Sequence, residues 1–193
     1  MSFPFRQMTV DEWLGRLIST QRLRIRAFRP EDAGDLFEYL SNDTIYIYES
    51  GEPQDQLQAQ AIAVEFSSGT DFWAVELIAE RKVIGQIYFQ QIEHLHRMTW
   101  ELGYIFNPHY HHHGYATEAV SALIRCGFAF GGIHRITAHC NPENTASWRL
   151  LERVGFRREG LLRKETFFRR DVNGKPLWTD TFVYALLGEE ISG

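Results

Sequence analysis

Hydrophobic positions in the first third of the chain follow first the period of a strand and then that of helices. Leu23, Ile25 and Ala27 alternate with arginines, which predicts a strand with one face toward solvent. Pro30 suits the first turn of a helix, and helical spacing predicts that its buried stripe consists of Ala33, Leu36, Phe37 and Leu40. A second helix is predicted over residues 55–67, with an inward face formed by Leu57, Ala61 and Val64.

The remaining hydrophobic runs predict one sheet with helices between its strands. Strands are predicted over residues 72–79, 83–92, 98–106, 135–140, 160–168 and 178–187, the last two around an Asn-Gly turn. Helices are predicted over residues 116–130 and from Asn144 or Thr145 to Val154. Residues 1–20 are expected to be an extension with a short helix, because Thr9 and Glu12 have capping-box spacing. No repeat or linker interrupts the pattern, so we expect one mixed α/β domain over residues 1–193.

Charge is distributed unevenly along the chain, although the net charge is only −5. Residues 31–80 include twelve Asp or Glu and no Lys or Arg, whereas residues 149–170 include eight bases against three acids. This uneven distribution of charge would let the domain bind an anionic ligand on one side and a cationic ligand on the other. The alternative is that both stretches are solvated surface.

The composition is that of an ordinary globular protein, with 44% hydrophobic and 23% charged residues. No stretch approaches the roughly 20 apolar residues that cross a bilayer, and the first residues do not resemble a secretion signal. We therefore expect a cytoplasmic protein without a membrane partner. Cys126 and Cys140 are then reduced thiols, since their spacing predicts neither a disulfide framework nor a zinc site. The acidic balance argues against nucleic-acid binding.

The most informative stretch is WELGYIFNPHYHHHGYATEAV, residues 100–120. Here a predicted strand is followed by a turn containing Gly114 and then by a predicted helix. The start of a helix presents unpaired backbone N–H groups and a partial positive charge, so it can bind phosphate without basic side chains. Gly114 and Ala116 are small enough to let phosphates approach the backbone. Taken alone this pattern is a weak indicator, because most strand–turn–helix glycines bind nothing.

The same turn resembles the acetyl-CoA pyrophosphate loop of the GNAT N-acetyltransferases, which reads Arg or Gln, two residues, Gly, one residue, then Gly or Ala. His111 stands in this sequence where the family has Arg or Gln, and a histidine can still donate a hydrogen bond. The resemblance implies the GNAT fold, a central mixed, mostly antiparallel twisted sheet flanked by helices, and acetyl-CoA as co-substrate. It further implies cofactor contacts at Tyr104, Ile105, Phe106, His111, His112, His113, Gly114, Tyr115, Ala116 and Thr117.

A second resemblance covers HCNPENTASWRLLERVGF, residues 139–156. It is similar to the GNAT branch that contains the ribosomal-protein N-terminal acetyltransferases, whose pattern is Asn, two residues, Ser, an aliphatic stretch and Gly-Phe. Together with segments near both ends of the chain, the likeness covers about residues 21–187. It implies further cofactor contacts at Asn141, Asn144, Ser147 and Arg149. The basic stretch after Arg149 would then face the phosphorylated nucleotide end of CoA.

The family mechanism is direct attack of an amine on the thioester in a ternary complex, which needs a base for the amine and a proton donor for the leaving thiolate. Many members carry a Tyr seven residues after the helix Asn, where this chain has Leu151. Ser147 is the natural replacement as donor, unless it only contacts backbone in the first helical turn. In this family the oxyanion is bound by a backbone N–H of the strand before the loop.

For the base we favour Glu101, which the family resemblance places beside the acetyl group. Its neighbours are apolar or aromatic, and such surroundings strengthen a carboxylate as a base. Glu165 is the second candidate, on a strand near the expected substrate side. Both could instead be surface carboxylates, and an amine that arrives partly deprotonated needs no base.

Several alternatives stay open at this level. A metal site could draw on His94, His96, His109 and the three histidines that follow Tyr110, but consecutive histidines point in different directions, so we predict no metal. Leu151 leaves open a catalytically silent acyl-CoA-binding module. The acceptor is expected to be a small amine or a protein N-terminus, and a basic one if the acids of residues 31–80 line its cleft. The aromatic tail strands, with Phe167, Phe168, Trp178 and Phe182, make a homodimer plausible.

Overall fold

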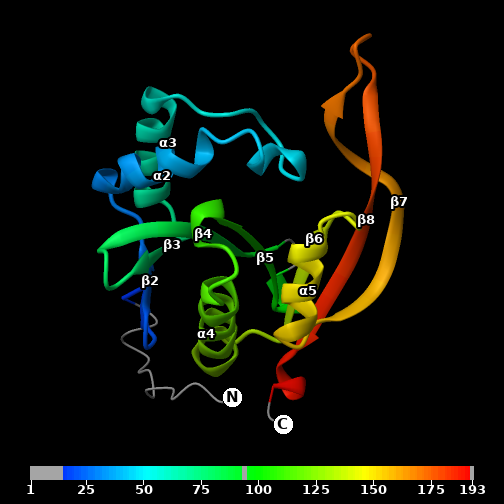
Figure 1. The fold of residues 1–193 in the computed structure, drawn as a ribbon. Helices are drawn as coiled ribbons and strands as arrows, with labels where there is room; N and C mark the ends of the chain where they lie inside the picture. The colour runs from blue at the N-terminus through cyan, green and yellow to red at the C-terminus, as the bar shows by residue number, and fades with distance from the viewer. Residues whose placement is uncertain (1–14, 93–94, 192–193) are drawn as a thin grey trace.

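An eight-stranded sheet forms the centre of the molecule in the computed structural model, which describes residues 15–92 and 95–191 (Figure 1). The predicted short helix near Thr9 lies outside these residues. The strand order is β1-β2-β3-β4-β5-β6-β8-β7. The strands are β1 (Leu17–Ser19), β2 (Leu23–Ala27), β3 (Phe72–Leu77), β4 (Lys82–Gln91), β5 (Thr99–Phe106), β6 (Arg135–Cys140), β7 (Arg157–Arg170) and β8 (Pro176–Leu187).

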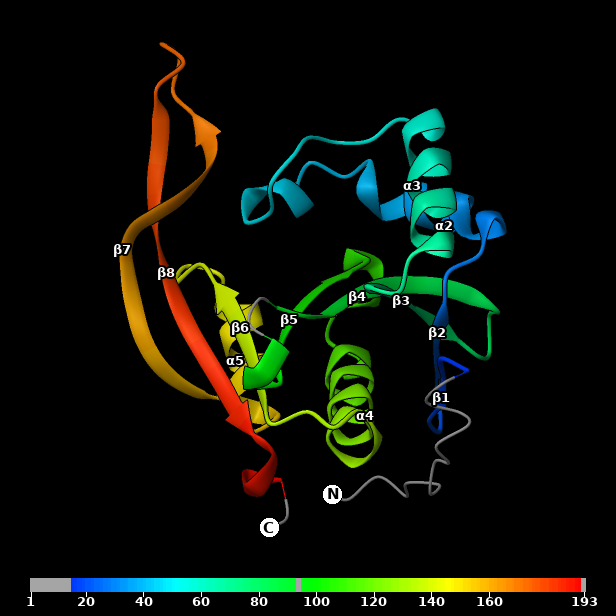
Figure 2. The same cartoon turned by 180° about the vertical axis from the view of Figure 1, so that it is seen from behind.

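Within the described residues, four α-helices cover the two faces of this sheet (Figures 1 and 2). Their bounds are α2 (Ala33–Leu40), α3 (Gln56–Ser68), α4 (Tyr115–Phe130) and α5 (Thr145–Arg153). One core packs α2 and α3 against β3 and β4. The larger core packs α4 and α5 against the opposite face of the sheet. The sheet thus lies between two hydrophobic cores, one formed with α2 and α3 and the other with α4 and α5.

Every neighbouring pair of strands is antiparallel except β5 and β6, which are parallel. This confirms the predicted mixed, mostly antiparallel sheet flanked by helices. The pairing of β5 with β6 covers only three residue pairs and ends at Glu101 and Thr137. Beyond that point β5 continues to Phe106 and β6 to Cys140. The two strands therefore separate in the middle of the sheet.

Helix α3 occupies the predicted segment but presents a different face to the core. Its buried residues are Ala59 and Ala63, whereas Leu57 is 77% exposed and Val64 is 50% exposed. The predicted inward face of Leu57, Ala61 and Val64 is therefore wrong. Alanines spaced four residues apart lie on one side of a helix, and their small side chains let α3 pack closely against α2. Hydrophobicity alone did not identify this packing face.

A buried ion network joins strand β2 to strand β3 and to the turn before α2. Nε of Arg26 donates to Glu76 at 2.7 Å, and both terminal nitrogens donate to the Asp32 carboxylate at 2.8 Å. All three side chains are 8% exposed. Charges buried this deeply are tolerated because each has an oppositely charged partner. The network fixes the start of α2 on the sheet.

We predict that Arg26→Met lowers the free energy of unfolding by about 3 kcal/mol or more, because it leaves the buried Asp32 without a cation and Glu76 with only the half-exposed Arg24. Arg24→Met is the matched control. Arg24 also pairs with Glu76, at 3.2 Å, but its side chain is 49% exposed, so we expect a loss of about 1 kcal/mol or less. Urea denaturation of the two variants measures both values. Equal losses would show that the buried network does not stabilise the fold.

Candidate active site

Two adjoining cavities open where strands β5 and β6 separate. The larger has a volume of about 500 Å³ and extends toward α2 and α3, and the smaller, of about 360 Å³, extends toward β7 and β8. Both are lined by the same four residues at their junction: Glu49, Glu101, His139 and Ser147. We call this place the junction. It gathers residues from a loop, two strands and a helix.

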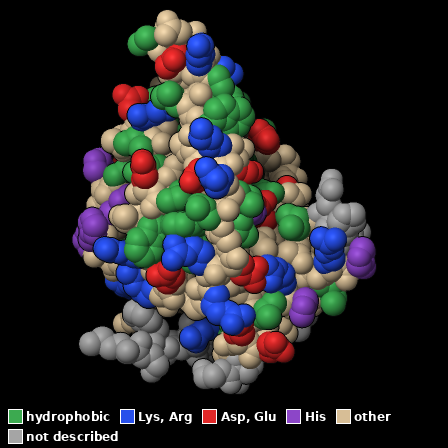
Figure 3. Space-filling model, turned by 90° about the vertical axis from the view of Figure 1, so that its right-hand side faces the viewer, with side chains coloured by type: hydrophobic (Ala, Val, Ile, Leu, Met, Phe, Trp, Pro, Cys, Tyr) green, Lys and Arg blue, Asp and Glu red, His purple; other side chains and the backbone are tan. Residues whose placement is uncertain are grey.

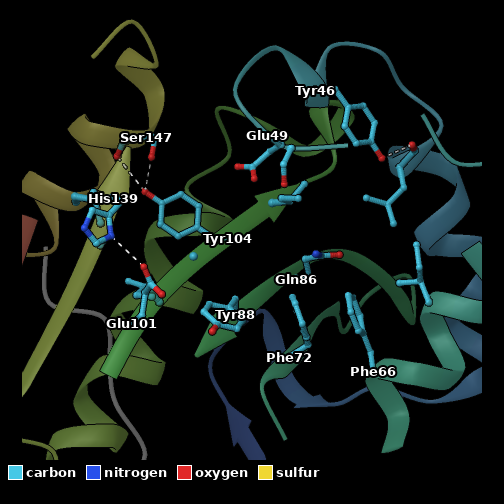
Figure 4. A pocket seen from close by; sticks show the side chains of 18 of the residues that line it. Tyr46, Glu49, Phe66, Phe72, Gln86, Tyr88, Glu101, Tyr104, His139 and Ser147 are labelled. Carbon is cyan, nitrogen blue, oxygen red and sulfur yellow. Dashed lines mark hydrogen bonds and ion pairs between the residues drawn. The ribbon is translucent and has the colours of Figure 1, made fainter. Parts of the chain in front are cut away.

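His139 and Glu101 form a hydrogen-bonded pair at the junction (Figure 4). Nδ1 of His139 lies 3.0 Å from Oε1 of Glu101. Glu101 is paired with Thr137 across the strands, so His139, two residues farther along β6, points to the same face of the sheet. The hydrogen bond to Glu101 raises the pKa of His139 above its ordinary value. The His139 side chain is 42% exposed and therefore accessible from the cleft.

Tyr104 and Ser147 form a second pair at the junction. The Tyr104 hydroxyl donates to the Ser147 carbonyl oxygen at 3.1 Å and lies 3.0 Å from the Ser147 hydroxyl. Ser147 is held in turn by Asn144, whose Oδ1 accepts from the Ser147 N–H as the cap of α5. Burial raises the pKa of Tyr104, so the phenol remains protonated. Leu151, one turn farther along α5, is buried and also lines the larger cavity.

Glu49 is a carboxylate that the sequence did not single out. It lies on the loop before α3, at the junction, and burial raises its pKa to about 7. It is the one residue among the twelve acids of residues 31–80 that lines these cavities. Others are engaged elsewhere: Asp32 and Glu76 with Arg26, Asp35 and Glu38 with Lys82, Glu80 with Tyr110, and Asp55 as the cap of α3. Half of the twelve acids therefore have structural partners away from the cavities.

The third candidate catalytic residue, Glu165, lies on β7 at the wall of the smaller cavity. Its carboxylate accepts a hydrogen bond from the Thr181 hydroxyl at 3.0 Å. The structure thus places Glu101, Ser147 and Glu165 along one cleft, but Glu165 does not line the larger cavity. Glu101 and Ser147 are the two that meet at the junction.

The glycine turn lies directly before α4, as the sequence predicted. Gly114 has φ +79°, a left-handed conformation that favours glycine, and it caps the helix. His111 folds back so that its Nε2 lies 3.0 Å from the Phe106 carbonyl oxygen. His113 stacks on Tyr115, with ring centroids 5.7 Å apart. The open N-terminus of α4 can therefore accept an anion.

Two residues that the sequence did not single out, Arg22 and Glu118, hold this turn in place. Glu118 is buried on α4 and accepts from the Arg22 Nε at 2.7 Å. Arg22 also donates to the His113 carbonyl oxygen at 3.0 Å, and its guanidinium lies over the Tyr115 ring. A guanidinium thus stands beside the turn although His111 replaces the arginine of the family motif. Arg22 is too distant in the sequence for local pattern to predict this contact.

The other predicted cofactor contacts are spread over several elements: Asn141 lines the smaller cavity, Thr117 lies on α4 and Arg149 on α5. Thr117 accepts from Arg153 at 3.3 Å, and the Asn141 side chain accepts from the Glu143 N–H at 2.8 Å. Arg149 is exposed, with its guanidinium 5.3 Å from the Trp148 ring centre. Ile105 lines the larger cavity, Ala116 lies in the first turn of α4, and the ring of His112 lies edge-on to that of His111, with centroids 6.3 Å apart.

Within the described part of the chain, no group of three or more His, Cys, Asp or Glu side chains could hold a metal ion. His94 lies outside that part. The described helices are all too short or too polar to span a bilayer.

The chain belongs to the GNAT acetyltransferase family, because residues 22–157 match its "Acetyltransferase (GNAT) domain" family. It is 35% identical over 175 residues to "Uncharacterized N-acetyltransferase YnaD" of Bacillus subtilis, covering 90% of this chain and 98% of that protein. A GNAT-family acetyltransferase structure from Bacillus anthracis is 33% identical, with a TM-score of 0.80, over 90% of this chain and 99% of that chain.

The fold is also shared with more distant acetyltransferase structures. A spermidine N-acetyltransferase from Vibrio cholerae, solved with CoA and spermine, has a TM-score of 0.74 at 22% identity, over 90% of this chain and all of that chain. A ribosomal-protein-S5-alanine acetyltransferase from Vibrio fischeri has a TM-score of 0.75 at 18% identity, over 90% and 97% of the two chains. At these identities the likeness concerns the fold alone.

The hydrogen bond between Glu101 and His139 predicts a specific titration. The pKa of His139 should lie above the ordinary 6.5 in the wild type, and Glu101→Gln should lower it because the carboxylate that stabilises the imidazolium is removed. Glu165→Gln should lower it less, since that charge acts without the hydrogen bond. NMR titration of the histidine rings measures all three values. The same pKa in wild type and Glu101→Gln would exclude the pair.

Proposed function

We propose that this protein transfers the acetyl group of acetyl-CoA to a primary amine by direct attack in a ternary complex. The observation that carries the proposal is the junction, where the Glu101–His139 pair and the Tyr104–Ser147 pair face one small space (Figure 4). One pair can accept a proton and the other can donate one. Amide formation from an amine and a thioester needs both steps.

Acetyl-CoA fits the gap between β5 and β6. Its pyrophosphate would lie at the N-terminus of α4, where the N–H groups of Tyr115, Ala116 and Thr117 begin the helix. A Cβ atom built on Gly114 would have only the Arg22 guanidinium within 4 Å, so the approach to the backbone is open. From there the pantetheine arm would follow the edge of β5 beyond Glu101, which brings the thioester to the junction. A backbone N–H on that edge is then available to the oxyanion.

His139 is the base in this proposal, and Glu101 holds its ring in position. The acceptor ammonium first loses one proton to solvent, and the free amine then gives a second proton to Nε2 of His139 as its nitrogen bonds to the thioester carbon. The carboxylate on Nδ1 stabilises the imidazolium that forms, in the same way that an aspartate orients a catalytic histidine. Glu49, on the loop above, is placed to attract the acceptor while it is still an ammonium ion.

Tyr104 and Ser147 supply the proton for the leaving group. When the C–S bond breaks, the CoA thiolate takes a proton from this hydroxyl pair. The raised pKa of Tyr104 excludes the phenolate as a base at neutral pH and keeps a hydroxyl proton available. In this arrangement the hydroxyl of Tyr104 stands in for the tyrosine that Leu151 replaces, which favours an active enzyme over a silent acyl-CoA-binding module.

The acceptor is either a small amine or a protein N-terminus, and the site of action proposed is the cytoplasm. A homodimer is proposed as well, through the long hairpin of β7 and β8. Hydrophobic side chains are exposed along this hairpin between basic ones (Figure 3), among them Leu161, Leu162, Leu177 and Trp178. Each is between 42% and 51% exposed, and burying such side chains between two subunits is favourable.

Gly114→Glu should weaken acetyl-CoA binding tenfold or more, about 1.4 kcal/mol, because it places bulk and negative charge where the pyrophosphate binds. Gly114→Asn is the matched control. Asparagine tolerates the left-handed backbone and adds bulk without charge, so it should lose less affinity than the glutamate variant, about threefold. Isothermal titration calorimetry with acetyl-CoA measures both. Equal affinity of the glutamate variant and the wild type would place the cofactor elsewhere.

His139→Gln should lower kcat about a hundredfold or more, because it removes the general base. The exposed His134, just before β6, provides the control, and His134→Gln should keep wild-type turnover. Tyr104→Phe and Ser147→Ala should lower kcat with little effect on acetyl-CoA binding, since a leaving-group proton matters most in the transition state. Release of CoA thiol with an amine acceptor measures these rates.

The pH profile gives a separate check on the base. The reaction needs neutral His139, so kcat/KM should rise as pH increases through its raised pKa. Glu101→Gln should move this acidic limb to lower pH. Full turnover in both His139→Gln and Tyr104→Phe would contradict the assigned roles without changing the family.

A further inference from the structure

The larger cavity continues beyond the junction into a space that the acetyl transfer itself does not use. We call this space, between α2, α3 and strands β3 to β5, the inner chamber. Phe66 and Phe72 stack there with ring centroids 3.8 Å apart, and Tyr88 lies 5.3 Å from Phe72 (Figure 4). The remaining apolar wall comes from Leu40, Ile62 and Ile105. Walls of this kind favour an apolar and preferably aromatic ligand.

A single buried amide lies in the wall of the inner chamber. Gln86 is 6% exposed, and its Oε1 accepts a hydrogen bond from the buried Tyr39 hydroxyl at 3.0 Å. This leaves the Nε2 group as a donor on a residue that lines the cavity. Nε2 is not among the fully buried side-chain atoms that lack a partner, so it is accessible from the cavity, where a ligand can reach it. An oxygen atom of a ligand in the chamber would satisfy this donor.

Charge is confined to the mouth of the inner chamber. The carboxylates that line the larger cavity are Glu49 and Glu101, and both lie at the junction; among the residues that the structure describes, no Lys or Arg lines it. One ammonium group can therefore be matched at the junction. A second ammonium deeper in the chamber would have no carboxylate partner, and burying an unpaired charge is costly. This arrangement disfavours polyamines as acceptors.

We propose that the acceptor is a small primary amine that carries an aromatic ring, with an oxygen atom on the far side of the ring. This inference rests on the proposed function. The amine would lie at the junction, the ring against Phe72 and Tyr88, and the oxygen at Gln86.

The length of the cavity fits such a molecule. Gln90 pairs with Glu101 and Gln86 pairs with Ile105, so four residues of strand, about 14 Å along the backbone, separate the position of Glu101, which holds the base, from that of the amide. A ring on a two-carbon arm, with a hydrogen bond of about 3 Å at each end, spans about that distance.

The first test is a panel of amines assayed by CoA thiol release: 2-phenylethylamine, its para-hydroxy analogue, n-propylamine and spermidine. Both ring amines should exceed spermidine in kcat/KM by at least tenfold, because they bury a ring without a second charge. Gln86→Leu should reduce the preference for the para-hydroxy compound over 2-phenylethylamine by about fivefold, the effect of one hydrogen bond.

The second test closes the chamber. Gly103 lines the larger cavity opposite Tyr88, and a Cβ there would meet Tyr88 at an ordinary 3.5 Å. Gly103→Leu therefore places a side chain in the passage without a backbone clash. It should lower kcat/KM for the ring amines at least tenfold relative to n-propylamine, whose turnover corrects for any effect on acetyl-CoA binding along β5. Gly160→Leu, on β7 where a Cβ meets open space, is the matched control and should keep the wild-type ratio.

The outcomes separate the two proposals. Faster turnover of spermidine than of the ring amines, or an unchanged ratio in Gly103→Leu, would overturn the aromatic acceptor and leave acetyl transfer in place. If none of the amines in the panel causes release of CoA although acetyl-CoA binds tightly, the proposed function is overturned. Calorimetry with the para-hydroxy amine then decides the inference: binding that Gly103→Leu abolishes supports it, and no binding to the wild type overturns it.

Discussion

The short parallel contact between β5 and β6 is the constraint on which the site depends. The sheet is continuous elsewhere, but this pairing ends after three residue pairs, at Glu101 and Thr137. Beyond this point the backbone N–H and C=O groups of β5 and β6 no longer pair with each other, and such groups need other hydrogen-bond partners. The opening therefore creates both the space for a ligand and a strand edge that can bind one. Every residue at the junction owes its position to this separation.

Two ionic clamps hold the structures on either side of the opening. Glu118 and Arg22 tie the start of α4 to β2 and so fix the turn at Gly114. The buried network of Arg26 fixes the start of α2, which forms one wall of the inner chamber. Neither clamp lies at the junction. They stabilise the frame in which the reacting groups are held, and this rigidity is what precise positioning requires.

The cleft gives three glutamates three different surroundings. Glu101 is hydrogen-bonded to His139, Glu165 accepts from Thr181, and Glu49 lies partly buried on a loop with its pKa raised to about 7. The same side chain can therefore orient a base, line a wall or meet a cation. The surroundings of Tyr104 likewise determine its state, since burial raises its pKa and keeps it protonated next to Ser147. Environment assigns these roles, because the side chains are chemically alike.

The sequence by itself determined the elements, the mixed sheet and the glycine turn, because these depend on local periodicity and on residues close together in the chain. It also proposed Glu101 and Ser147 as catalytic residues, through their place in family motifs, and both line the junction. It misplaced the inward face of α3, since packing of Ala59 and Ala63 outweighed the hydrophobicity of Leu57. Only the tertiary structure paired His139 with Glu101, Tyr104 with Ser147 and Arg22 with Glu118. Those contacts join segments 38 to 96 residues apart, and no local pattern records which strand edges and helix ends will meet in space.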